Sequence, residues 1–133
     1  MKKLFKEEML RIKNPFLGQS DRMVKNARIS NSKARPDGYI YILKLKGFDI
    51  YKIGVSSAPK RRIKDIDSSS PFGVECICLE WFKNAYDLEE LLHDNFIKNT
   101  LRKEWFKINT KDIFDLIIDL KHMSKEGIYI IRK

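Results

Sequence analysis

Six polar residues in the middle of the chain have the types and the order that phosphodiester hydrolysis needs. The reaction requires a base for the attacking water, a cation that stabilises the phosphate, and an anionic ligand for a metal ion. Two tyrosines are candidates for the first role, a lysine and an arginine for the second, and a glutamate, with a histidine on the same helix face, for the third. These residues are Tyr39, Tyr41, Lys52, Arg62, Glu89 and His93.

Two predicted strands hold the first three of these side chains. Residues 39–43 form a β-branched and aromatic run, residues 46–49 are a turn candidate, and residues 50–55 read as the returning strand. Side chains alternate between the faces of a strand, so one face of this hairpin is apolar and the other brings tyrosine hydroxyls near Lys52. We therefore predict an antiparallel hairpin at the centre of the site.

The remaining elements predict an α+β fold with a small, mainly antiparallel sheet flanked by helices. Trp81 and Trp105 are interpreted as core residues, and Glu104 as a partner of Arg102 or a cap. The predicted elements are a helix through residues 60–66 that begins near Ser56 or Ser57, a strand over 74–82, a helix over 85–97 capped by Asn84, a short extended segment over 104–108, a helix capped by Thr110, and an edge strand over 127–131.

The charge of the chain is concentrated at its start. The net charge is +9, and residues 1–35 carry ten lysines and arginines against three acidic residues. Such an excess favours a polyanionic partner, either nucleic acid or an acidic membrane surface. Residues 3–13 are predicted to form a short helix in this arm. The candidate nucleic-acid contacts are Lys60, Arg61, Lys64, Arg11, Lys13, Arg22, Lys25 and Arg28.

Cysteine usage and hydropathy restrict the class of protein further. Cys76 and Cys78 are the only cysteines, and their spacing fits neither a redox pair nor a zinc site. Two reduced thiols suit a cytoplasmic protein. No run approaches the ~18 apolar residues that a membrane span needs, so we expect no membrane partner.

The ordered motifs resemble the GIY-YIG nuclease superfamily. Gly38-Tyr39-Ile40-Tyr41 is followed by Tyr51-Lys52-Ile53-Gly54, then by Arg62, and then by Leu88-Glu89 on a helix. Two later segments, Leu92-His93 and Glu104-Trp105-Phe106, are similar to a phage-rich branch with lysine in the second motif, known as a phage Orf-type DNA-binding domain or meiotically up-regulated gene family.

The resemblance covers residues 38–108 and implies a division of the chain. A basic arm, predicted to be helical, occupies residues 1–37, and a GIY-YIG-like nuclease domain occupies residues 38–133. Gly127-Ile128-Tyr129 also spells the first motif, but no second motif follows it. We therefore interpret that segment as an edge strand.

The resemblance also implies a role for each site residue. Tyr41, favoured over Tyr39 by its spacing to the second motif, is the general base or a water-orienting phenol, and Lys52 holds Tyr41 or the water. Arg62 binds the scissile phosphate, for which its planar fork is better suited than a lysine. Glu89 ligates one divalent cation, Mg²⁺ or its substitute Mn²⁺. His93 is interpreted as a supporting hydrogen-bonding partner rather than a metal ligand.

Four functions compete at this point. The first is a metal-dependent DNA endonuclease of phage or mobile-element type, and the second is a catalytically silent DNA-binding module or regulator on the same fold. RNA binding or cleavage and a membrane contact through residues 3–16 rank below them. A nuclease with one site needs two passes or two subunits to cut both strands, so the sequence leaves a homodimer open.

Overall fold

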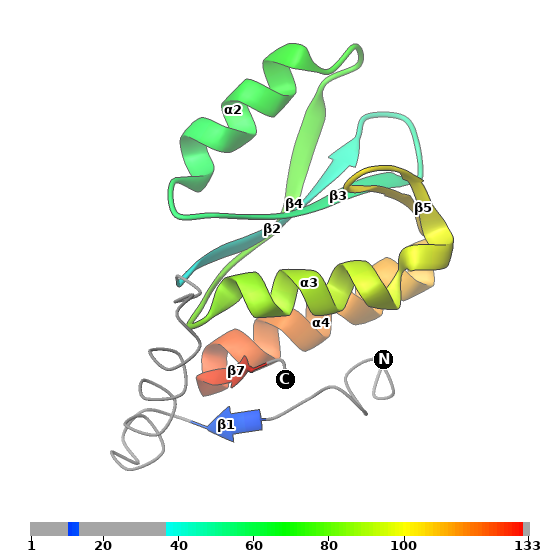
Figure 1. Cartoon of the computed structure of the whole chain (residues 1–133). Helices are drawn as coiled ribbons and strands as arrows, with labels where there is room; N and C mark the ends of the chain where they lie inside the picture. The colour runs from blue at the N-terminus through cyan, green and yellow to red at the C-terminus, as the bar shows by residue number, and fades with distance from the viewer. Residues whose placement is uncertain (1–10, 14–36, 132–133) are drawn as a thin grey trace.

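A five-stranded antiparallel sheet with helices on both faces forms the centre of the molecule (Figure 1). The computed structural model describes residues 11–13 and 37–131. The strand order is β4-β2-β3-β6-β5. The strands are β2 (Gly38–Leu45), β3 (Ile50–Ser56), β4 (Val74–Phe82), β5 (Thr100–Arg102) and β6 (Trp105–Lys107). The helices are α2 (Pro59–Ser69), α3 (Ala85–Asn95), the 3₁₀ turn η1 (Ile97–Asn99) and α4 (Thr110–Glu126). This confirms the predicted α+β fold.

The helices divide unequally between the two faces of the sheet. In Figure 1, α2 lies on one side, and α3 and α4 lie together on the other. Apolar residues of β2 and β3 alternate accordingly: Ile42 and Ile53 belong to the larger core with α3 and α4, whereas Leu43 packs with Ile66 of α2. The strand alternation that the sequence predicted for the hairpin therefore sets the two layers.

A second, two-stranded sheet joins the two ends of the described chain. Arg11–Lys13 forms β1, which pairs antiparallel with β7 (Ile128–Ile130). The helix predicted over residues 3–13 is therefore wrong for residues 11–13, and the rest of that prediction lies outside the described residues. β7 is a strand as predicted, but its partner is β1 rather than the edge of the main sheet.

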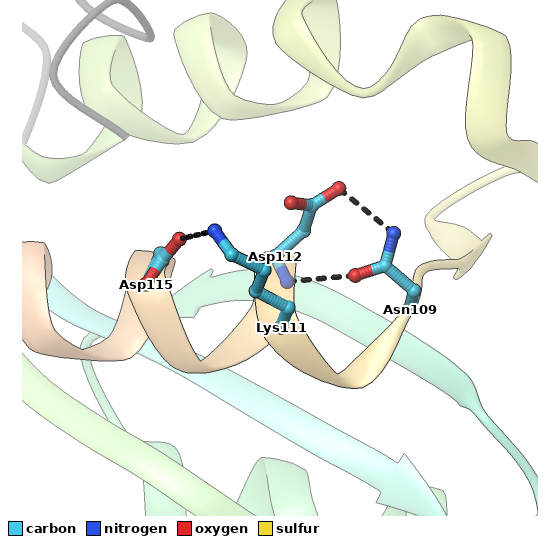
Figure 2. A network of polar contacts seen from close by, with 4 residues as sticks. All are labelled: Asn109, Lys111, Asp112 and Asp115. Atoms are coloured by element: carbon cyan, nitrogen blue, oxygen red, sulfur yellow. Dashed lines mark hydrogen bonds and ion pairs between the residues drawn. The ribbon is translucent and has the colours of Figure 1, made fainter.

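All three described helix starts depart from the sequence prediction. Ala58, rather than Ser56 or Ser57, is the N-cap of α2, and it makes no side-chain capping bond. Asn109, rather than Thr110, caps α4, because its Oδ1 accepts a hydrogen bond of 2.8 Å from the backbone N–H of Asp112 (Figure 2). Asn84 does occupy the N-cap position of α3, yet its side chain makes no capping bond. Its amide instead donates to Asp87 at 2.8 Å and to the carbonyl of Ile130 at 2.6 Å, which ties β7 to α3.

The length and hydropathy of the described helices can be compared with those of a membrane-spanning helix. Within residues 37–131, none of them combines the length with the apolar character that crossing a membrane requires.

Candidate active site

The position of Tyr41 depends on a glycine in the neighbouring strand. Tyr41 of β2 lies directly opposite Gly54 of β3, and its side chain is 1% exposed. A Cβ atom at position 54 would overlap the hydroxyl and ring carbons of Tyr41. The phenol therefore lies across β3 only because residue 54 has no side chain, which gives a physical reason for the glycine in the Lys-Ile-Gly motif.

Arg62 reaches the Tyr41 hydroxyl from α2. The interaction of its guanidinium with the phenol raises the pKa of Arg62. Burial raises the pKa of Tyr41 above 10.0, Arg62 opposes that rise, and the charges of Glu104 and Glu89 add to it. Burial therefore outweighs the nearby cation, and in these surroundings Tyr41 keeps its proton at neutral pH.

Lys52 has a different partner from the one that the resemblance implied. Its Nζ forms an ion pair of 3.0 Å with Oε1 of Glu104, and it lies 5.4 Å from the ring centroid of Trp105. The backbone N–H of Ile53 also bonds to the carbonyl of Glu104, at 3.3 Å. Lys52 is buried, so its charge needs this carboxylate. Glu104 is thus a site residue and not the predicted partner of Arg102.

The sequence reasoning missed the role of Glu104 because that role depends on strand register. The register places Lys52 of β3 opposite Trp105 of β6, the residue after Glu104. The motif Glu104-Trp105-Phe106 was already part of the family resemblance, and this was the one signal that pointed to the glutamate.

Glu89 reaches the site from α3, on the other side of the sheet. β6 pairs with β3 only as far as Lys52, so the rest of β3 has no β6 residue beside it. Burial raises the pKa of Glu89, His93 and Lys52 lower it, and Glu104 and Glu90 raise it. Glu89 and Glu104 therefore repel one another at this open end of β3.

His93 makes a hydrogen bond from α3 to the neighbouring strand β3. Its Nε2 lies 2.8 Å from the carbonyl oxygen of Ile53, and since a carbonyl only accepts, this nitrogen donates its proton. The ring also lies against Phe106, with centroids 5.3 Å apart. These contacts fix α3 to the part of β3 that has no β6 partner, one helical turn away from Glu89.

Two carboxylates of this site are suited to a divalent cation. Among the described residues, no group of three or more histidine, cysteine, aspartate or glutamate side chains could hold a metal ion. Mg²⁺ does not need such a group, because it commonly takes one or two carboxylates and completes its shell with water and phosphate oxygens. The mutual repulsion of Glu89 and Glu104 is what a cation would relieve, so the residues present fit Mg²⁺.

An open cleft of about 490 Å³ leads to this group of side chains. Lys52, Arg62 and Trp105 line it together with residues of α2 and of the β2–β3 hairpin. Lys60, Arg61 and Lys64 are exposed on α2. Arg11 and Lys13 lie in β1, and the predicted contacts Arg22, Lys25 and Arg28 lie outside the described residues. The cleft is lined by two cations, Lys52 and Arg62, and by one acid, Asp65.

Tyr39 lies apart from this network. It occupies the same face of β2 as Tyr41 but lines a second cavity, together with Leu79 and the start of α2. The candidate site therefore consists of five residues: Tyr41, Lys52, Arg62, Glu89 and Glu104. The sequence predicted the first four as site residues but not Glu104.

A family comparison covers the same part of the chain. The model of the T5orf172 domain matches residues 38–121, which is more than half of the sequence. The chain belongs to the T5orf172 domain family. Membership supports the coarse form of the resemblance, a phage-type nuclease or DNA-binding module. No curated protein and no solved structure matches this T5orf172 domain.

Proposed function

We propose that this T5orf172 domain is a metal-dependent DNA endonuclease that hydrolyses phosphodiester bonds. The observation that carries the proposal is that the Tyr41 phenol and the Arg62 guanidinium interact, beside the carboxylates of Glu89 and Glu104. A phenol that keeps its proton, a guanidinium and a carboxylate then lie together, and Arg62 also lines the cleft.

Each residue contributes a separate part of the reaction. Arg62 binds two non-bridging oxygens of the scissile phosphate through its planar fork. Tyr41 orients the attacking water, whose oxygen bonds to phosphorus as the bond to the 3′-oxygen breaks. A proton of the water passes to solvent, and the departing 3′-oxygen takes a proton from solvent. The products are a 5′-phosphate and a 3′-hydroxyl. A Mg²⁺ ion held by Glu89 would supply positive charge to the phosphate oxygens and the water.

In this proposal Lys52 takes no part in proton transfer and contributes a positive charge beside the cleft. Its ion pair with Glu104 keeps an ammonium group beside the cleft while neutralising one of the two acids near Tyr41. The raised pKa of Tyr41 favours a water-orienting phenol over a phenolate base, unless a bound cation adds further positive charge.

A DNA-binding module without turnover is the second candidate. The same raised pKa favours it, because a buried phenol that keeps its proton removes no proton from water. In that case Arg62, Lys52 and the exposed cations of α2 hold a phosphate that is never cut.

A plasmid-nicking assay with Mg²⁺ or Mn²⁺ separates the two candidates. We expect the wild type to convert supercoiled DNA to nicked or linear forms, and Glu89→Gln and Tyr41→Phe to lose at least ~100-fold in rate, the scale of one transition-state contact. Glu90→Gln, next to Glu89 on α3, and Tyr51→Phe, a tyrosine on the opposite face of the sheet, are the matched controls. Salt-sensitive DNA binding without cleavage would identify the binding module instead.

A further inference from the structure

An exposed apolar surface lies beside the site on the α2 face of the sheet. Tyr39 of β2 pairs with Trp81 of β4, and Tyr41 pairs with Leu79. Residues opposite one another in an antiparallel pair share a face, so these side chains are on the face that carries Tyr41. Leu79 is 37% exposed and Trp81 is 48% exposed, which corrects the interpretation of Trp81 as core. We call Tyr39, Leu79 and Trp81 the aromatic platform.

The platform borders a cavity with a basic rim. A hollow of about 460 Å³ lies between Tyr39 and Leu79 on one side and the residues that begin α2 on the other. Lys60 and Arg61 line it, and none of the described residues that line it is acidic. Glu80, between Leu79 and Trp81 in β4, turns to the other face and pairs with Lys121 of α4 at 3.3 Å. The charged residues that line the cavity beside the platform, Lys60 and Arg61, are therefore both positive.

The platform is also close to the candidate site. Tyr39 and Tyr41 are two residues apart in one strand, which corresponds to about 6.6 Å. A stacked DNA strand advances ~3.4 Å per nucleotide, so a strand with its phosphate at Arg62 reaches the platform within one to two nucleotides.

We propose that the aromatic platform stacks an unpaired base of a DNA strand whose backbone passes Lys60 and Arg61. The inference rests on the proposed function, because it names the substrate of the same site: DNA with unpaired nucleotides beside the bond that is cut. A base inside a duplex already stacks on its neighbours, whereas an unpaired base has a free face for an aromatic side chain. The two cations supply the charge that the phosphates of such a strand require.

Binding measured in EDTA tests this inference without any cleavage. Fluorescence anisotropy would give the affinity of the full chain for labelled oligodeoxythymidine and for a duplex of equal length. We expect Trp81→Ala to weaken single-strand binding by about 5- to 100-fold, with duplex binding changed less than ~2-fold. Trp81→Phe restores most of the affinity, because a ring remains. Phe114→Ala, which removes a 60% exposed ring from α4, leaves both affinities unchanged.

Each other result has a definite meaning. Unchanged single-strand affinity in Trp81→Ala, or equal losses of affinity for both substrates, overturns the inference. A change from dimer to monomer in Trp81→Ala, measured by light scattering, also overturns it, because the aromatic platform would then join two copies of the chain. Selective loss of single-strand binding in a protein that never nicks DNA upholds the platform and rejects the proposed hydrolysis.

Discussion

The two faces of the central sheet are built from the same strands but differ in what covers them. Toward α3 and α4, nineteen of the described buried residues form one apolar cluster. Toward α2, only four buried residues form a cluster, and one of them is the site residue Tyr41. One face is closed by two helices, whereas the other is half covered and keeps its cleft and its polar groups.

This difference separates folding from chemistry within single strands. Ile40 and Ile42 are fully buried in the larger cluster, while Tyr41 between them points to the opposite face and meets Arg62. Burial at the site shifts the pKa of Tyr41 from the open face and that of Glu89 from α3, while the cleft beside Lys52 and Arg62 stays open. The closed face therefore provides most of the stability, and the open face provides most of the site, which α3 completes with Glu89.

Truncation of one buried side chain on each face gives the largest expected effect. Leu92 is 0% exposed in the larger cluster, and Leu92→Ala should lower the free energy of unfolding by about 2–5 kcal/mol. Ile66→Ala, in the small cluster beside the open cleft, should cost clearly less. Urea denaturation followed by circular dichroism measures both. An equal or larger loss for Ile66→Ala would contradict the comparison.

Gly54→Ala should have a smaller effect on stability and a strong one on the site. The added methyl overlaps Tyr41, and overpacking of this kind typically costs about 1–3 kcal/mol. A double-mutant cycle isolates the cause: in a Tyr41→Ala background, Gly54→Ala should cost much less, because its clash partner is gone. The same loss in both backgrounds would show that the glycine serves the backbone and not the tyrosine.

Local sequence patterns predicted much of this architecture. The hairpin, β4 and the three helices follow from β-branched runs, alternation and helix-start residues that lie within a few positions of one another. The short strand β5 was missed because all three of its residues, Thr100–Arg102, are exposed and carry no alternating pattern. The pairing of β1 with β7 joins segments more than a hundred residues apart, which no local pattern encodes.

In the candidate site, too, some features follow from the sequence pattern and others depend on how distant strands pair. Tyr41, Lys52, Arg62 and Glu89 were predictable because their order matches a known arrangement, and the structure brings them together. The ion pair of Lys52 with Glu104 depends on the register between β3 and β6. Trp81 was mistaken for core because both faces of β4 carry apolar residues, and the sequence does not say how far α2 extends over one of them.

The smallest expected effect concerns Glu89. This residue reaches the site from α3, a helix of the closed face, and should destabilise the fold at neutral pH. Its pKa is raised above 4.5, chiefly by burial, so the folded state binds its proton more tightly than the unfolded chain does. Stability should therefore fall as the pH rises from 4.5 through the folded-state pKa, because ionisation then favours the unfolded chain. Glu89→Gln removes this ionisation. In EDTA, the variant should be more stable than the wild type at pH 7, and the difference should vanish below the ordinary pKa of a glutamate.

Denaturation curves across this pH range, with Glu90→Gln as the neighbouring control, measure the effect. A variant that is less stable than the wild type at pH 7, or a difference that does not change with pH, would show that Glu89 stabilises the fold and would contradict this prediction. Added Mg²⁺ extends the test, because a cation bound by the folded state alone stabilises it by mass action. If Glu89 holds the ion, Mg²⁺ should raise the stability of the wild type and of Glu90→Gln but leave that of Glu89→Gln unchanged.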